Sequence, residues 1–158
     1  MDKGLSIYRV VENTQEIYGL CLRDELYLRK GLMLEALDES RLLAKQCLAI
    51  FYSDGSEGYQ AVCVLVPGRE DGVSFYTGML YVKRTLRGTG IAQALVKRGI
   101  ALAGEKITRW QPWDMASGIF FQRLLDSGVL SEENFTPYRL RILSECQRLL
   151  ASGLVKPR

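Results

Sequence analysis

The chain has 158 residues, of which 47% are hydrophobic and 25% are charged, and its formal net charge is +3. These values are typical of a globular protein that buries a sizeable core, so we expect one domain over residues 1–158. No apolar run is long enough for a membrane span or a signal peptide, which argues against a membrane protein and favours a cytoplasmic one.

Histidine is absent, and the four cysteines (Cys21, Cys47, Cys63 and Cys146) form no C-x-x-C pair. Without imidazole, Ser-His-Asp and Cys-His catalysis and most zinc sites are excluded, and we expect no metal. Scattered cysteines are typical of core residues in a reducing compartment. Any chemistry must therefore use carboxylates, hydroxyls, backbone amides or a bound co-substrate.

Hydrophobic spacing predicts a strand and two helices at the start of the chain. The strand is expected over Leu5–Val11. Asn13 and Thr14 then predict a helix start, and the helical pattern continues to about Arg29. A second helix is expected over Leu32–Gln46 with four leucines facing inward: Leu34, Leu37, Leu42 and Leu43.

A meander of three strands is expected next, because turn residues separate three β-type segments. The first two strands are joined by Asp54-Gly55-Ser56, and Pro67-Gly68 is expected to end the second. Asp71-Gly72 is the next turn. The predicted strands are Cys47–Tyr52, Tyr59–Val66 and Val73–Val82.

The last of these strands turns through a basic, glycine-bearing loop into a helix over Ile91–Ala103. Such a junction predicts an anion site, because first-turn N–H groups lack intrahelical partners and the helix dipole is positive there. Gly88 and Gly90 let the backbone approach a ligand, and Arg84 and Arg87 add positive charge. We expect a diphosphate to bind here.

The segment around this loop is strongly basic, since residues 81–110 hold seven basic side chains and one acidic side chain, Glu105. Segments of this kind also occur as solvated faces or as nucleic-acid surfaces. Here the charge coincides with the glycine loop, which favours a compact phosphorylated ligand. A nucleic-acid partner is the less favoured interpretation.

Beyond the basic segment, a short strand is expected over Ile107–Trp110. Asp114 or Ser117 can open a further helix that ends near Ser127-Gly128. A last helix is expected over Tyr138–Leu150. Its apolar residues lie largely on one face, so the helix would either close the sheet differently or suit a protein partner or a homodimer.

The sequence Arg87-Gly88-Thr89-Gly90-Ile91-Ala92 fits the pattern Gln/Arg-x-x-Gly-x-Gly/Ala, and here the chain resembles the GNAT superfamily of acyl-CoA N-acyltransferases. The order of predicted elements is similar to that family as well. The resemblance implies an α/β (α+β) fold with a mixed, largely antiparallel central sheet flanked by helices. It covers about residues 1–128, whereas residues 129–158 depart from it as an added helical segment.

The resemblance implies an acetyl-CoA-dependent N-acetyltransferase in which a primary amine attacks the thioester directly. The backbone of Leu80, Tyr81 and Val82 would pair with the pantetheine arm of the coenzyme. The N–H of Leu80 would stabilise the oxyanion. The diphosphate would be held by the loop residues Arg87, Gly88, Thr89, Gly90, Ile91 and Ala92.

Two catalytic groups of the family have no clear counterpart in this chain. The carboxylate base is missing from the inner face of the strand before the loop, where Tyr76 is the one plausible polar group. A tyrosine is a poor base at neutral pH. The tyrosine that would protonate the thiolate falls at Phe120 or Phe121, which leaves water, Tyr138 or Ser117 as substitutes.

The acceptor would be a small-molecule amine, or a lysine or N-terminal amine of a protein. Carboxylates of the predicted second helix would attract such a cation, although an exposed helix face explains them more simply: Glu35, Asp38 and Glu39. Trp110 and Trp113 either wall a substrate cleft, anchor a partner or pack at a strand end. The alternative function is a GNAT-like binding or regulatory protein, catalytically weak or inactive, that acts through protein partners.

Overall fold

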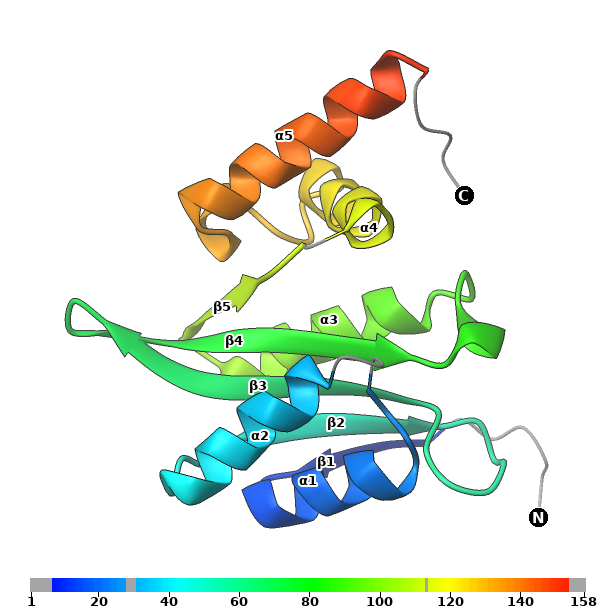
Figure 1. Cartoon of the computed structure of the whole chain (residues 1–158), viewed down its shortest axis with the longest axis vertical. Helices are drawn as coiled ribbons and strands as arrows, with labels where there is room; N and C mark the ends of the chain where they lie inside the picture. Colours follow the sequence, from blue (N-terminus) through cyan, green and yellow to red (C-terminus); the bar gives the residue numbers. More distant parts are fainter. Residues whose placement is uncertain (1–6, 28–30, 113, 154–158) are drawn as a thin grey trace. The chain divides into compact units, whose positions relative to one another are not determined.

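A computed structural model describes residues 7–27, 31–112 and 114–153. The chain forms two compact units, residues 1–108 and residues 109–158. Figure 1 shows the first unit as a sheet with helices on both faces, and the second unit as predominantly helical. The expectations for Leu5, Ser6, residues 28–30, Trp113 and residues 154–158 fall outside the described residues.

The central sheet contains β1 (Ile7–Val11), β2 (Leu48–Ser53), β3 (Ala61–Glu70), β4 (Val73–Val82) and β5 (Ile107–Trp110). Its strands lie in chain order, β1-β2-β3-β4-β5. Neighbouring strands from β1 to β4 are antiparallel, which confirms the predicted largely antiparallel sheet. β5 carries the chain from the first unit into the second.

Helices cover both faces of this sheet (Figure 1). α1 (Thr14–Arg23) and α2 (Leu32–Leu42) share a hydrophobic core with one face, to which Met79 and Tyr81 of β4 belong. α3 (Ile91–Ala103) packs on the other face, against β2, β3 and β4. Since side chains alternate along a strand, the even-numbered residues of β4 face α3. The predicted bounds of β4, α3 and β5 are confirmed residue for residue.

α1 begins where the sequence predicts and ends earlier. The Asn13 side chain caps it by accepting a hydrogen bond at 2.9 Å from a backbone N–H of the first turn. The expected end near Arg29 is wrong, because the helix stops at Arg23 and the chain turns at Glu25, which has a φ of +55°. This turn buries Leu26 completely, and that burial outweighs a longer helix.

α2 is also shorter than predicted, ending at Leu42 instead of Gln46. The expectation that Leu42 and Leu43 face inward is wrong, since they are 76% and 58% exposed. The buried face of α2 is set by Ser40 and its neighbours one and two turns earlier, and Leu42 lies about 200° around the helix axis from Ser40. The chain then turns toward β2 at Ala44, whose φ is +55°. The residues of α2 that do pack on the core are Met33, Leu34, Leu37 and Ser40.

β3 continues through Pro67-Gly68 to Glu70, so the expectation that these two residues end the strand is wrong. The register of β2 with β3 stops at Leu65, and the described part of β3 beyond it pairs with β4. A proline is tolerated on such an open edge, because no neighbouring strand there needs its missing N–H. The predicted turn at Asp71-Gly72 is confirmed, with φ values of +51° and +79° that suit a type I′ hairpin.

The second unit contains α4 (Met115–Asp126) and α5 (Pro137–Ala151). Asp114 and Ser117 form a capping box at the start of α4, so both predicted start residues are used. Residues 114–153 contain helices and no strand. In the described ranges, no helix has the length and apolar character that crossing a membrane requires.

Candidate functional site

The loop between β4 and α3 is a tight turn. The 3₁₀ turn η1 (Arg84–Leu86) is closed by a hydrogen bond of 2.9 Å from the Leu86 N–H to the Lys83 carbonyl oxygen. Gly88 and Gly90 then have φ values of +80° and +87°, in the left-handed region that other residues rarely adopt. These two conformations lead the chain into α3.

The N-terminus of α3 presents open backbone donors. The first intrahelical bond runs from the Ala94 N–H to the Gly90 carbonyl oxygen at 3.1 Å, so the N–H groups of residues 90–93 precede it. No described side chain caps this end of the helix. Open space surrounds the position that a Cβ would take at Gly88 or at Gly90. An anion can therefore approach these N–H groups, and the helix dipole favours it.

The end of β4 directs part of its backbone away from β3. The Lys83 N–H donates to the carbonyl oxygen of Gln60, in the β2–β3 connection, at 3.0 Å. The next pair along the two strands is Val82 with Ala61. In antiparallel geometry this makes Ala61 and Val82 a non-hydrogen-bonded pair, whose N–H and C=O groups point outward. Leu80 has the same orientation, whereas the backbone of Tyr81 faces β3.

Two side chains of the loop fold back onto its own backbone. Arg87 Nε donates to the Val82 carbonyl oxygen at 3.0 Å, and the Thr89 hydroxyl donates to the Leu86 carbonyl oxygen. The sequence places Arg87 among the expected diphosphate ligands. In the structure its Nε donates to β4, while nothing lies within 4 Å of the position that a Cβ would take at Gly88 or Gly90.

A shallow depression of about 400 Å³ adjoins the start of α3 and is lined by Tyr8, Tyr52, Leu86, Thr89, Gly90 and Ile91. The ring centroids of Tyr8 and Tyr52 are 5.2 Å apart, and the Arg98 guanidinium lies 3.7 Å from the centroid of the Tyr8 ring. No sequence signal indicates either tyrosine, since both belong to strands far from the loop along the chain. A larger open depression, of about 590 Å³, lies between the start of α1 and the end of α2.

Tyr76, the candidate polar group of β4, lies on the face that α3 covers. The Lys106 ammonium is 5.1 Å from the centroid of its ring. At about 3.4 Å per residue, roughly 20 Å of strand separate the backbones of Tyr76 and Val82. The structure therefore does not bring Tyr76 together with the loop. β4 carries no carboxylate at any position.

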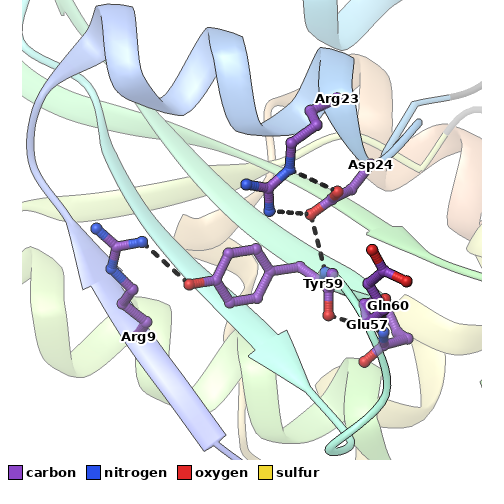
Figure 2. A network of polar contacts seen from close by, with 7 residues as sticks. Arg9, Arg23, Asp24, Glu57, Tyr59 and Gln60 are labelled. Carbon is purple, nitrogen blue, oxygen red and sulfur yellow. Dashed lines mark hydrogen bonds and ion pairs between the residues drawn. The ribbon is translucent and has the colours of Figure 1, made fainter.

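A polar network lies on the α1 side of the sheet (Figure 2). Asp24 accepts two hydrogen bonds of 2.8 Å from the Arg23 guanidinium and one of 2.8 Å from the Tyr59 backbone N–H. Arg9 donates to the Tyr59 hydroxyl at 3.1 Å and to Glu16 at 2.6 Å. The bonds from Arg23 lower the pKa of the Asp24 carboxyl, which makes it a weak base. The sequence does not reveal this network, because Asp24 and Tyr59 lie 35 positions apart in the chain.

The candidates for a proton donor lie in the second unit. The Ser117 hydroxyl belongs to the capping box of α4, and Tyr138 is 58% exposed on α5. Phe120 and Phe121 pack edge to face at 5.0 Å between ring centroids. Trp110 is 1% exposed and its ring centroid lies 5.9 Å from that of Phe121. Packing is therefore the interpretation of Trp110 that the structure supports.

The carboxylates expected to attract an acceptor lie along α2. Asp38 forms an i,i+3 ion pair with Arg41, whose guanidinium also lies 4.6 Å from the centroid of the Tyr18 ring. Glu35 and Glu39 are exposed. One carboxylate of the three is thus already paired, as on an ordinary exposed helix face.

No protein-family model matches the sequence, and no curated protein is significantly similar to it. Solved structures are similar in fold. The GNAT family N-acetyltransferase YhbS from Escherichia coli, in complex with CoA, has a TM-score of 0.56 at 17% identity, over 78% of this chain and 69% of that chain. AtaTR bound with AcCoA has a TM-score of 0.54 at 12% identity, over 75% and 82%. A mutant AtaT toxin bound to the C-terminus of the antitoxin AtaR has a TM-score of 0.50 at 13% identity, over 78% and 84%.

At identities this low, the structural similarity establishes a common fold, and function has to be argued from the residues of the site. The element order observed here runs from β1 through α1, α2 and the three-stranded meander to the loop and α3, which is the order that the sequence predicts. The chain therefore has the fold of the GNAT N-acetyltransferases.

Proposed function

We propose that this chain binds acetyl-CoA and transfers the acetyl group to a primary amine. The observation that carries the proposal is the start of α3, where the uncapped N–H groups of residues 90–93 follow the glycine-bearing loop in a chain of GNAT fold. The similar structures of YhbS and AtaTR hold CoA and AcCoA, respectively. The loop supplies the matching chemistry for a diphosphate.

The backbone of residues 88–92 would hold the diphosphate. Its N–H groups converge with the positive end of the α3 dipole, which is worth about half an elementary charge. Arg84 adds positive charge from the exposed side of the loop. Within the described ranges, neither Arg84 nor Arg87 forms an ion pair with a carboxylate. The charge of Arg84 is therefore available to an anionic ligand, whereas Arg87 already donates from Nε to the Val82 carbonyl oxygen.

In the transfer step, the amine nitrogen attacks the thioester carbonyl carbon, the C–N bond forms, and the C–S bond breaks as the thiolate leaves. Leu80 and Val82 direct their backbone away from β3 and would pair with the pantetheine arm. The Leu80 N–H would donate to the carbonyl oxygen as negative charge develops on it. Holding the two reactants together supplies much of the rate. Tyr81 lies between these contacts with its backbone toward β3.

β4 offers few groups that could accept or donate the protons of this reaction. An ammonium group has no lone pair for attack, and β4 has no carboxylate that could deprotonate it. The amine therefore has to reach the thioester already uncharged. Tyr76 is the polar group that the sequence offers as a base on β4, but a neutral phenol is a poor proton acceptor. Water therefore accepts the proton that the amine loses after attack, and it also protonates the departing thiolate.

Amine-dependent release of CoA tests this function. The protein is incubated with acetyl-CoA and a panel of small amines, lysine-containing peptides and peptides with free N-termini. Free thiol and the acetylated acceptor are then measured. Gly90→Glu should abolish release, because its carboxylate would repel the diphosphate. Gly104→Glu is the matched control, since Gly104 also has a positive φ, +66°, and open space but lies at the other end of α3. Equal activity of the two variants would refute the loop as the binding site.

A second candidate function is a GNAT-like binding or regulatory protein with little or no catalysis. The missing carboxylate of β4 favours it. The similar AtaT structure, which is bound to the C-terminus of AtaR, gives a precedent for a protein partner. This function predicts acetyl-CoA binding that Gly90→Glu abolishes, without release of CoA by any amine in the panel.

A further inference from the structure

One side-chain hydrogen bond joins the two parts of the loop that would contact different halves of the coenzyme. Arg87 Nε donates to the Val82 carbonyl oxygen at 3.0 Å. Val82 is the last residue of β4 and is 8% exposed. Arg87 directly precedes the glycine segment whose amides form the anion site. The bond thus spans from the strand end to the start of that segment.

The direction of the Val82 carbonyl explains why this bond matters. Val82 and Ala61 form a non-hydrogen-bonded pair, so β3 cannot satisfy this carbonyl. The Nε–H of Arg87 satisfies it instead, at 3.0 Å. On the opposite edge, the Lys83 N–H is fixed at 3.0 Å to the β2–β3 connection. Hydrogen bonds therefore hold the strand end on both edges.

The backbone of Arg87 is fixed as well. Its N–H donates to the Arg84 carbonyl oxygen at 3.2 Å, within the turn that the Leu86 N–H closes onto Lys83. Because the guanidinium is planar, Nε can reach a carbonyl only in a narrow range of orientations. The side chain and backbone of Arg87 together set how residues 88–92 leave the end of β4.

We infer that Arg87 is a positioning residue: its Nε–H, and not its positive charge, sets the geometry between the end of β4 and the anion-binding amides of α3. The inference rests on the proposed function, because CoA is the ligand whose pantetheine arm and diphosphate would meet these two parts. It assigns the diphosphate to the backbone amides and gives the Arg87 side chain a role in holding Val82.

Three substitutions separate the N–H donor from the charge. In Arg87→Gln the amide nitrogen occupies the same place along the side chain as Arg Nε, so the donor is kept and the charge is lost. In Arg87→Lys the charge is kept, but a carbon atom takes the place of Nε. Arg87→Met removes both. The three side chains are unbranched and similar in reach.

The experiment measures the dissociation constant of CoA by calorimetry for the wild type and these three variants. We expect Arg87→Gln to stay within about threefold of the wild type. Arg87→Lys and Arg87→Met should both weaken binding about tenfold, the scale of one hydrogen bond. The inference is overturned if Lys preserves affinity while Gln loses it, if all three variants lose it equally, or if none does.

A measurement without ligand keeps the proposed function and the inference distinguishable. The bond to Val82 is present without coenzyme, so the melting temperature should follow the same order: wild type and Gln high, Lys and Met lower by about 2–4 °C. If the wild type binds no CoA, the proposed function fails. If it binds CoA and either series departs from the expected order, the function stands and the positioning role of Arg87 fails.

Discussion

The Asp24 carboxylate accepts a hydrogen bond of 2.8 Å from the Tyr59 backbone N–H and so joins the end of α1 to the segment that leads into β3. The Asp24 side chain is only 9% exposed. The carboxylate also lies against Gly58, where an added Cβ would be 3.0 Å from its Oδ1. This contact ties the α1–α2 layer to the β2–β3 connection, whose carbonyl receives the Lys83 N–H at the start of the loop.

Replacing Asp24 should destabilise the protein in a pH-dependent way. Asp24→Ala leaves the Tyr59 N–H unpaired and should lower the free energy of unfolding by about 2 kcal/mol at neutral pH. The pKa of Asp24 is lower in the folded chain than its ordinary value, so the stabilisation is present above about pH 4 and is lost as the pH falls through the folded pKa.

Denaturant unfolding at several pH values measures this difference between wild type and Asp24→Ala. Glu145→Gln serves as the control, because Glu145 forms an exposed ion pair with Arg148 and should leave stability nearly unchanged. A difference between wild type and Asp24→Ala that grows as the pH drops below 4 would contradict the assigned ionised contact.

Gly118 of α4 lies in close contact with Cys146 of α5. A Cβ added at Gly118 would be 2.5 Å from the Cys146 Sγ, closer than atoms can pack. Gly118→Ala should therefore lower the free energy of unfolding by about 1–3 kcal/mol, and adding Cys146→Ala should restore part of it. Gly19→Ala in α1, where nothing lies within 4 Å of the added carbon, should instead stabilise the protein. Equal effects of the two glycine substitutions in thermal unfolding would refute the contact.

The four cysteines should be inert in the folded protein. All are buried and free, and burial raises the pKa of the Cys21 and Cys63 thiols to about 12. At pH 8 such thiols are ionised in roughly one molecule in ten thousand. A disulfide reagent such as Ellman's should therefore react slowly with the native chain and fully after denaturation. Rapid native reaction would show an accessible thiolate, and it would also interfere with the assay for released CoA.

The acetyl transfer rate should rise with pH. Because β4 supplies no carboxylate to deprotonate the amine, kcat/KM should follow the fraction of free amine, about tenfold per pH unit. The increase should continue toward the pKa of the acceptor, about 8 for an N-terminal amine and about 10.4 for a lysine. A plateau that begins near pH 6 would point to a protein base that this account does not include.

Elements bounded by local signals could be predicted to the residue. β4 follows the Asp71-Gly72 turn, and α3 lies between Gly90 and Gly104, both with positive φ. Elements whose ends depend on tertiary contacts could not be predicted to the residue. α1 stops where the burial of Leu26 turns the chain, and β3 passes Pro67 because β2 no longer pairs beside it.

The same distinction applies to the candidate site. Its anion-binding part could be predicted, because Gly88, Gly90 and the start of α3 are contiguous in sequence. The bond from Arg87 to Val82 could not, since the pattern of residue types does not encode the orientation of a long side chain. The contact of Asp24 with Tyr59 joins residues 35 positions apart, and only the folded chain reveals it.

The measurement that tests the central claim most directly is the calorimetric titration of the wild-type protein with acetyl-CoA, with Gly90→Glu titrated in parallel. The account predicts micromolar binding by the wild type and none by Gly90→Glu. An absence of both binding heat and thermal stabilisation in the wild type would contradict it, as would a variant that binds as tightly as the wild type.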